Sequence, residues 1–446
     1  MKFTSYLSYP RLIISLINFV GISLIASQAL AAGPTQNPPP PANPESGLQA
    51  LGQQIFFDRN LSRPAGTACA SCHNAATGFA DNHGSAVGVP LGSVPGVQGL
   101  RNAMSNAYGA FVPPFHIVVT NGNLVAAGGL FRDGRVDTLA LQALVPLLSS
   151  QEMNNSSEAA VVQKIAAAGY ANQFKAQFGP GIFSNPNQAF QDIGVAISAY
   201  ETTQLLQQFS SKYDLFIQGK VQLAANETRG MDLFMGPARG NCASCHTMNP
   251  NSKIAADNLF ADFSYHALGI PRNHAIPANA NPSFYDLGLC GPKRQIPALP
   301  ANAPATASAQ QFCGAFRTVS LRNVALRSAF MHNGFFKDLP SVIDFYSTRN
   351  SNPQHWYGPA GIPDDLPVAY QPNIIHDRPP FNRPQSAGPL FSAGEASDLL
   401  AFLVTLSDGY GKQNGNSPIA PPPPPPPKPA QANARATVTT NPFSAH

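Results

Sequence analysis

The chain has 446 residues, about three times the size of an average domain, which excludes a peptide or toxin and leaves room for one to three domains. Charged residues make up only 11%, against roughly 25% in an ordinary soluble domain, and the 44 prolines and 36 glycines predict long irregular connections. The net charge of +4 is not concentrated in any block, which argues against nucleic acid as a partner.

The first 32 residues have the pattern of a cleaved export signal. Lys2 and Arg11 precede an apolar run over 12–26, and Ala29 to Ala31 matches a small-residue cleavage site. A membrane anchor is the alternative, but the run is shorter than the roughly 20 apolar residues that a spanning helix needs. We therefore expect a signal peptide over 1–32 and a periplasmic mature protein without a membrane span.

Proline-rich segments flank the rest of the chain. Residues 33–46 form the first, and residues 411–446, with seven consecutive prolines over 421–427, form the second. Such stretches favour extended conformations and bury little surface. We interpret them as a linker and a disordered tail, so that the function lies within residues 47–410.

Two copies of the sequence Cys-Ala-Ser-Cys-His are the strongest signal in the chain. They occupy residues 69–73 and 242–246, and Cys-x-x-Cys-His is the attachment pattern of c-type haem. Two thiols on one helical turn can bond to the two vinyl groups of a haem, and the histidine supplies an imidazole to the iron. A redox dithiol or half of a zinc site does not require that histidine. The sequence predicts two covalent haem c groups, attached through Cys69, Cys72, Cys242 and Cys245 and ligated by His73 and His246.

Hydrophobic periodicity predicts a mainly α fold with long irregular loops and a helical haem domain around each motif. Apolar residues at helical spacing indicate a long amphipathic helix over Ile193–Lys220, followed by a linker, and another helix over Glu395–Leu406. No alternating strand pattern of useful length is visible. We assign residues 47–205 to an N-terminal domain and residues 206–410 to a C-terminal domain.

The two remaining cysteines, Cys290 and Cys313, lie in a Gly/Pro-rich loop over Pro271–Gly314. Two free thiols are the alternative, but an oxidising compartment favours a disulfide that closes this loop. We expect it to have a structural role only.

Four further short motifs occur in the body of the chain. They are Phe131 to Arg135, Gln151 to Met153, Leu321 to Val324 and Met331 to Gly334. Together with the paired haem motifs they resemble the bacterial dihaem cytochrome c peroxidases and their MauG-like branch, over nearly all of residues 47–410. The resemblance implies two cytochrome c-like domains, a peroxide-reactive N-terminal haem and a C-terminal electron-transfer haem. Electrons would come from a small redox protein or from an oxidisable residue of a protein substrate.

The resemblance implies that Glu152 is the acid–base residue of the first haem. In the family a glutamate stands about twenty positions after the tryptophan of an F-W-D-G-R motif, and Glu152 has that spacing from Arg132. A carboxylate beside an open iron site can take a proton from hydrogen peroxide and return it to the leaving oxygen. By the same register, Gln142 and Pro146 lie on the distal side, where Gln142 orients Glu152 or a water. Composition alone would favour a surface glutamate.

The first iron is expected to have an open sixth position. Relatives with two histidine ligands carry the second about sixteen residues after the motif, where this chain has Val89. His83 is the nearest histidine, and its Gly, Asn and Asp neighbours predict a surface turn.

For the second haem the resemblance implies Tyr346 as the other axial ligand, about fourteen residues after His332. Ordinary peroxidases have Met there, and the MauG-like branch has Tyr. A phenolate favours ferric and higher oxidation states, whereas a thioether raises the reduction potential. Met248, Met331 and a core role for the tyrosine are the alternatives, and His332 is expected in or near the second pocket.

The chain departs from the family at Arg132, which replaces the tryptophan between the haems. The route between the irons must then use another group, such as Phe131 or a propionate. Arg135 and Arg322 are expected to bind propionates, because guanidinium binds carboxylate through two parallel hydrogen bonds. A solvated surface position is the alternative for each.

The family also binds one calcium ion between its domains. The matching residues are Asn102 and the backbone carbonyls of Arg327 and Ala329, and calcium prefers oxygen ligands of this kind.

The sequence thus predicts an exported dihaem oxidoreductase that reduces hydrogen peroxide at the N-terminal haem. A dihaem electron carrier without turnover is the alternative, and an oxygenase acting on an apolar substrate is a third reading.

Overall fold

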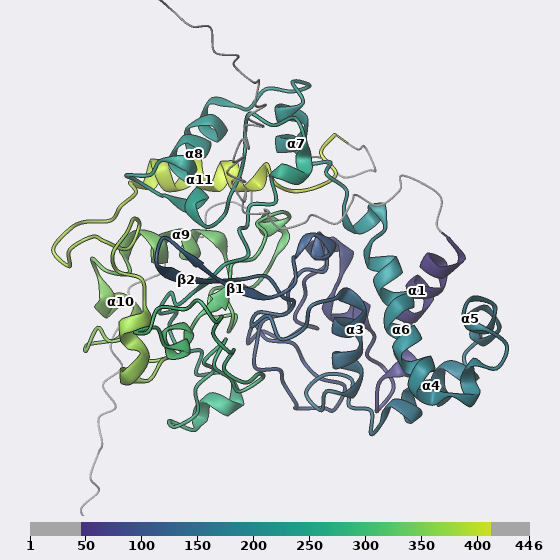
Figure 1. Ribbon diagram of the computed structural model, residues 1–446. Helices are drawn as coiled ribbons and strands as arrows, with labels where there is room; N and C mark the ends of the chain where they lie inside the picture. Colours follow the sequence, from purple (N-terminus) through teal and green to yellow (C-terminus); the bar gives the residue numbers. More distant parts are fainter. Residues whose placement is uncertain (1–45, 412–446) are drawn as a thin grey trace, which may run out of the picture. The chain divides into compact units, whose positions relative to one another are not determined.

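The computed structural model describes residues 46–411, so the predicted signal peptide, nearly all of the proline-rich linker and nearly all of the tail lie outside the described residues. Within this range the fold is mainly α, as predicted, with long irregular connections (Figure 1). The α-helices are α1 (Gly47–Phe57), α2 (Cys69–Cys72), α3 (Leu139–Leu148), α4 (Glu158–Ala167), α5 (Ala171–Phe178), α6 (Pro186–Glu201), α7 (Lys212–Ile217), α8 (Ala225–Met235), α9 (Leu339–Thr348), α10 (Pro353–Tyr357) and α11 (Ala393–Val404).

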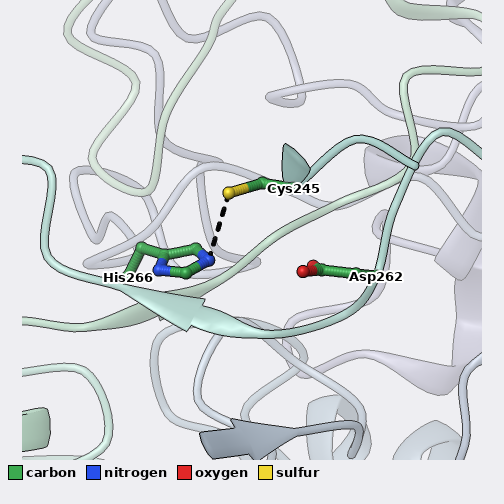
Figure 2. A group of neighbouring side chains, drawn as sticks. All are labelled: Cys245, Asp262 and His266. Carbon is green, nitrogen blue, oxygen red and sulfur yellow. Dashed lines mark hydrogen bonds between the residues drawn. The ribbon is translucent and has the colours of Figure 1, made fainter. Parts of the chain in front are cut away.

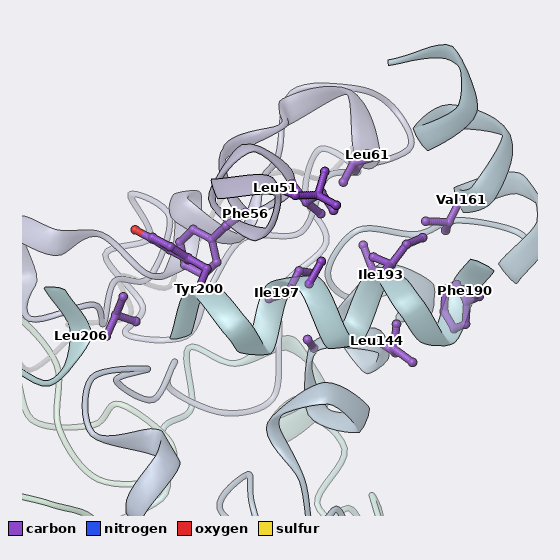
Figure 3. Close-up of a cluster of buried hydrophobic side chains, with 14 of the residues drawn as sticks. Leu51, Phe56, Leu61, Leu144, Val161, Phe190, Ile193, Ile197, Tyr200 and Leu206 are labelled. Atoms are coloured by element: carbon purple, nitrogen blue, oxygen red, sulfur yellow. The ribbon is translucent and has the colours of Figure 1, made fainter. Parts of the chain in front are cut away.

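Helix α6 is the centre of the first hydrophobic cluster. Asn185 caps its start by accepting a hydrogen bond from Gln188, and Pro186 stands at the first helical position, where its missing N–H costs nothing. Helices α1, α3 and α4 contact α6, and its buried side chains fill the space between them (Figure 3). The cluster also includes three side chains from much later in the chain, namely Leu259, Ala261 and Phe263.

A second hydrophobic cluster forms around α8 and α11, which contact each other along their lengths, and α9 contacts α11. Helix α11 begins with a capping box in which Ser392 and Glu395 satisfy each other's backbone N–H groups. The prediction of a helix over Glu395–Leu406 is confirmed with ends that differ by two residues.

Both clusters depend on a helix pair that approaches at a glycine. A Cβ on Gly52 of α1 would lie 1.8 Å from the carbonyl oxygen of Ala196 on α6, and a Cβ on Gly230 of α8 would lie 2.0 Å from that of Asp398 on α11. Neither position has room for a side chain, so the two contacts fix the register of each pair.

The predicted helix over Ile193–Lys220 is wrong in its boundaries. Helix α6 starts earlier and ends at Glu201, and α7 starts at Lys212 behind its own cap, Ser211. Between them Phe209 has a φ of 44°, and its N–H donates to the Tyr108 hydroxyl at 3.0 Å. The Phe209 N–H thus donates to a residue distant in the sequence instead of to a helical carbonyl. The local periodicity of the sequence does not reveal this exchange.

The fold also contains short strands, which the absence of an alternating pattern did not reveal. Strands β1 (His116–Thr120) and β2 (Asn123–Ala127) form an antiparallel hairpin, and β3 (Tyr265–His266) pairs with β4 (Phe316–Arg317). The hairpin turn is Asn121-Gly122, with φ of 51° and 77°, a pair that favours such turns. The signal was present, but the half-buried strands do not alternate between apolar and polar residues.

The disulfide between Cys290 and Cys313 is present, as predicted. It closes a loop that also carries Lys293 and Arg294.

One backbone motif occurs twice. Before α3, Leu130 bridges to Val136 around a turn with Gly134 at φ 64°, and before α9, Phe330 bridges to Phe336 around a turn with Gly334 at φ 64°. Residues 131 and 331 both have positive φ, and the caps Thr138 and Asp338 start the two helices at matching positions. The two segments are therefore structurally equivalent, residue for residue.

We predict that Gly52→Ala lowers the free energy of unfolding by about 1–3 kcal/mol, because the new methyl group overlaps the Ala196 carbonyl. Chemical denaturation measures the change. Gly394→Ala near the start of α11 is the matched control, since a Cβ there meets nothing within 4 Å, and it should leave stability unchanged or raise it by up to about 1 kcal/mol. Equal effects of the two substitutions would contradict the close approach.

Candidate functional site

The first Cys-x-x-Cys-His motif lines a cavity of about 570 Å³. Cys69 and Cys72 are the ends of the single turn α2, which places both sulfurs on one helical turn. The turn after α3 contributes Glu152 to the same cavity. The structure thus brings together the predicted site residues of the first haem, which are Cys69, Cys72, His73, Arg135, Gln142, Pro146 and Glu152.

The two motif histidines are oriented in the same way. His73 Nδ1 lies 3.1 Å from the Phe79 carbonyl oxygen, and His246 Nδ1 lies 2.9 Å from that of Phe260. A carbonyl only accepts, so Nδ1 carries the proton and Nε2 keeps a free lone pair. Burial lowers the pKa of both imidazoles, which keeps them neutral, as metal ligation requires.

The second motif lines a separate cavity of about 220 Å³. Tyr346 and Met331 line it too, and Met248 is not among its lining residues. Two further histidines face this cavity, but their Nε2 atoms are engaged: His332 contacts Asp365 Oδ2 at 3.2 Å, and His266 contacts Ser264 Oγ at 2.7 Å. Tyr346 and Met331 also carry donor atoms that could hold a metal in this cavity.

Tyr346 and Met331 occupy different positions in the repeated motif. Because α3 and α9 start at equivalent positions, Pro146 and Tyr346 occupy the same place on the two helices, and each lines its own cavity. Met331 is instead equivalent to Phe131, in the turn before the helix. Helix α9 therefore presents a phenol to the second cavity. Helix α3 presents a proline, which has no donor atom, to the first cavity.

The protein alone disfavours a phenolate at Tyr346. Burial raises its pKa, with further contributions from Cys242 and Cys245, and its ring contacts Phe345 and Phe381. A bound cation reverses this preference, because its charge stabilises the anion. A phenolate at Tyr346 would thus require a bound metal.

Glu152 has a buried carboxylate oxygen, Oε2, with no hydrogen-bond partner among the described residues. Burial raises the pKa of this carboxyl, and Lys293 and Arg135 act against the shift. An oxygen without a partner inside a cavity is available to a bound molecule, and a carboxyl group whose pKa is shifted by burial is a candidate for proton exchange.

Glu201, at the last turn of α6, also lines the first cavity and was not anticipated. It is 2% exposed, its Oε1 accepts from Asn106 at 2.6 Å, and its Oε2 has no partner among the described atoms. Burial raises its pKa to about 8. The available signal was its position, one helical turn after the apolar Ile197.

The two glycine contacts give Glu201 an equivalent in the second cluster. Gly52 faces Ala196 and Gly230 faces Asp398, so Glu201 on α6 corresponds to Leu403 on α11. Both side chains line their cavities. Glu201 therefore adds a carboxyl group to the first cavity at a position where the second cavity has an apolar side chain.

Three arginines, Arg132, Arg317 and Arg327, line both cavities and so lie between them. None forms an ion pair with a described carboxylate, and Arg327 Nε has no partner there. Buried charge without a counter-ion is costly. Anionic propionates facing these guanidinium groups would supply the missing charge, so the residues present fit a haem in each cavity.

Arg322 does not fit the predicted propionate role. Its two Nη atoms bind Asp214 at 3.0 and 2.8 Å, and its Nε donates to the Asn258 carbonyl. This buried pair is structural, because the fork of the guanidinium is already occupied. Arg135 donates to Asp133 through Nη1, which leaves its other Nη free for a propionate. Its guanidinium carbon lies 3.6 Å from the centre of the Phe131 ring.

His83 lies in a turn, as predicted, but it is not fully exposed. It is half-buried, with φ of 52°, and its Nδ1 contacts the Leu91 carbonyl at 2.9 Å. It does not line the first cavity, and Val89 is fully buried. Neither residue offers the first iron a ligand.

Cys245, Asp262 and His266 lie within 4.8 Å of one another through their donor atoms (Figure 2). The composition suits a metal, and Cys245 Sγ lies 3.3 Å from His266 Nε2. Cys245, however, belongs to the second Cys-x-x-Cys-His motif, so attachment of a haem would use its sulfur for a thioether bond. We assign no separate metal ion to this group.

Comparison with known proteins agrees with this arrangement. A family model described as di-haem cytochrome c peroxidase matches residues 47–222. The methylamine utilization protein MauG of Paracoccus denitrificans is 33% identical over 372 residues, which cover 82% of this chain and 89% of MauG. Cytochrome c551 peroxidase of Pseudomonas aeruginosa is 26% identical over 295 residues, which cover 66% of this chain and 69% of that enzyme. The crystal structure of the diheme peroxidase BthA from Burkholderia thailandensis has 39% identity and a TM-score of 0.75, and the match covers 82% of this chain and 87% of BthA.

The chain belongs to the family of dihaem cytochrome c peroxidases and MauG. It is therefore an oxidoreductase of the dihaem peroxidase type, and membership implies two haem c cofactors. No helix within residues 46–411 is long and apolar enough to cross a membrane.

We predict that Tyr346→Phe changes the ferric absorption and electron paramagnetic resonance spectra of the second haem and lets it bind added imidazole. The reason is that the substitution removes the oxygen donor and keeps the ring. Tyr357→Phe is the control, because that phenol is in the same hydrophobic cluster and donates to the Gly269 carbonyl instead. Unchanged spectra in Tyr346→Phe would contradict the ligand assignment.

We predict that Glu201→Gln flattens the pH dependence of stability. The folded protein holds the proton up to about pH 8, against an ordinary value of 4.5, so the unfolded chain loses it first as pH rises. Wild-type stability should fall across this interval by up to about 1.4 kcal/mol per pH unit, and the glutamine variant lacks this contribution. Denaturation at several pH values tests this, with Glu158→Gln as the control, and parallel curves for wild type and Glu201→Gln would contradict it.

Proposed function

We propose that this protein is an exported, periplasmic dihaem c-type peroxidase that reduces hydrogen peroxide at the N-terminal cavity. Residues 47–205 would form the peroxidatic domain and residues 206–410 the electron-transfer domain, after removal of a signal peptide over 1–32. A small redox protein, or an oxidisable residue of a protein substrate, would supply the electrons.

The observation that carries the proposal is the difference between two equivalent positions. The first cavity has Pro146 where the second has Tyr346, and Glu152 adds an unpartnered carboxylate oxygen to the first cavity alone. A haem held by His73 would thus have a free face beside a proton acceptor. The second haem would be closed by a ligand from α9.

A haem held by His73 would supply an iron that binds peroxide and gives it the two electrons that break the O–O bond, and the electron donor would then restore those electrons. Glu152 takes the proton from the peroxide oxygen that approaches the metal and returns it to the oxygen that leaves as water. Gln142, which lies on α3 and lines the same cavity, orients Glu152 or a bridging water. Lys293 and Arg135 limit how far burial raises the pKa of Glu152.

The second site supports the first as a store of oxidising equivalents. Tyr346 as a phenolate ligand stabilises the oxidised metal. The solved relatives include a BthA variant in which a tyrosine was changed to methionine. Arg132, where relatives have tryptophan, lines both cavities and makes a redox-inactive side chain part of the route between them.

We predict that Glu152→Gln slows peroxide consumption by about 10²- to 10⁴-fold, the usual contribution of general acid–base catalysis. Stopped-flow mixing of the loaded protein with stoichiometric peroxide, followed through the haem spectrum, measures the rate. Glu158→Gln in the first turn of α4 is the matched control and should react as wild type. An unchanged rate in Glu152→Gln would remove this carboxyl from the mechanism.

The wild-type rate should rise with pH through one titration, because Glu152 must be ionised to accept the proton and burial places its pKa above the ordinary 4.5. This step should be absent in Glu152→Gln. A wild-type protein whose two haems both remain inert to peroxide would instead be a dihaem electron carrier.

A further inference from the structure

Asn102 is the residue that the family resemblance assigns to calcium. Its side chain is buried, with 4% exposed. Its Oδ1 accepts two hydrogen bonds, from Arg132 Nη2 at 2.7 Å and from Arg327 Nη2 at 2.5 Å, and its backbone oxygen accepts from Arg132 Nε at 3.1 Å. Its Nδ2 donates to the Gly88 carbonyl at 3.0 Å. Both lone pairs of the amide oxygen are therefore in use.

These contacts do not fit a calcium ion. Calcium would need Asn102 Oδ1 at about 2.3–2.6 Å, on the lone pairs that now accept from two guanidinium groups. It would also stand beside two positive charges, with no described carboxylate paired to either of them. Carboxylates nearby are already committed: Asp286 and Asp133 both bind Arg101.

The cationic group at this place is supplied by the chain. Arg132 is 5% exposed and makes two hydrogen bonds to one residue, which ties the turn before α3 to the Asn102 segment. Arg327 brings the segment before the second repeated turn to the same oxygen and also donates to the Ala103 carbonyl at 3.0 Å. A bridging cation would make the same connections between these three segments.

We propose that the Arg132 guanidinium replaces the inter-haem calcium ion and that this protein binds no calcium at Asn102. The substitution at this position then has two consequences at once, since it removes an aromatic ring and installs a covalently held cation. The proposal does not depend on the peroxidase activity, because it concerns a structural cation.

The test is calcium content and calcium sensitivity of the purified protein with both haems attached. Elemental analysis after gel filtration in metal-free buffer should give far less than one calcium per chain. The melting temperature and the haem spectrum should be the same in EGTA and in millimolar calcium chloride. One tightly held calcium per chain, or a spectrum that changes on chelation, would overturn the proposal.

A pair of variants tests whether Arg132 itself excludes the ion. Arg132→Met frees Asn102 Oδ1 from one donor and removes its charge, so the melting temperature should fall and should now rise again on adding calcium chloride. Arg317→Met is the matched control: it removes a guanidinium of the same cluster that donates to the Phe131 carbonyl and not to Asn102, so it should stay insensitive to calcium. If Arg132→Met does not accumulate, Arg132→Gln takes its place. A variant at Arg132 that gains no response to calcium would overturn the assignment.

Discussion

Three buried guanidinium groups without an anion of their own constrain the rest of this structure. Arg132, Arg317 and Arg327 lie between two cavities, and no described carboxylate pairs with them. Leaving such charges buried and uncompensated costs several kcal/mol for each ion. The arrangement is stable only with anions nearby, and the propionates of two haems are anions of the right kind. Cofactor binding and stability of the fold should therefore be coupled.

The same local structure is used twice, with different chemistry at equivalent positions. In both halves a glycine allows two helices to meet, a phenylalanine carbonyl orients the motif histidine, and a turn with a positive φ starts a helix that lines the cavity. The side chains then differ: Pro146 corresponds to Tyr346, and Glu201 corresponds to Leu403. One cavity gains carboxyl groups and has a proline at the position where the other has a phenol.

Replacing tryptophan by Arg132 affects both electron transfer and electrostatics. A guanidinium is always charged and is not oxidised in proteins, so it cannot relay an electron hole as an indole can. Arg132 also donates two hydrogen bonds to Asn102, the residue that a divalent cation would otherwise use as a ligand.

The sequence by itself determined the features that short-range chemistry specifies. The spacing of Cys69, Cys72 and His73 requires one helical turn, and the helical spacing of apolar residues from Leu399 to Leu406 located α11 to within two residues. It did not determine where α6 ends, because the N–H of Phe209 is taken by Tyr108, about a hundred positions away. Only the tertiary structure decided that Arg322 pairs with Asp214, that Glu201 faces the first cavity, and that two arginines share the oxygen of Asn102. Each of these depends on which distant groups meet in a buried place, where an unpaired charge or polar atom is costly.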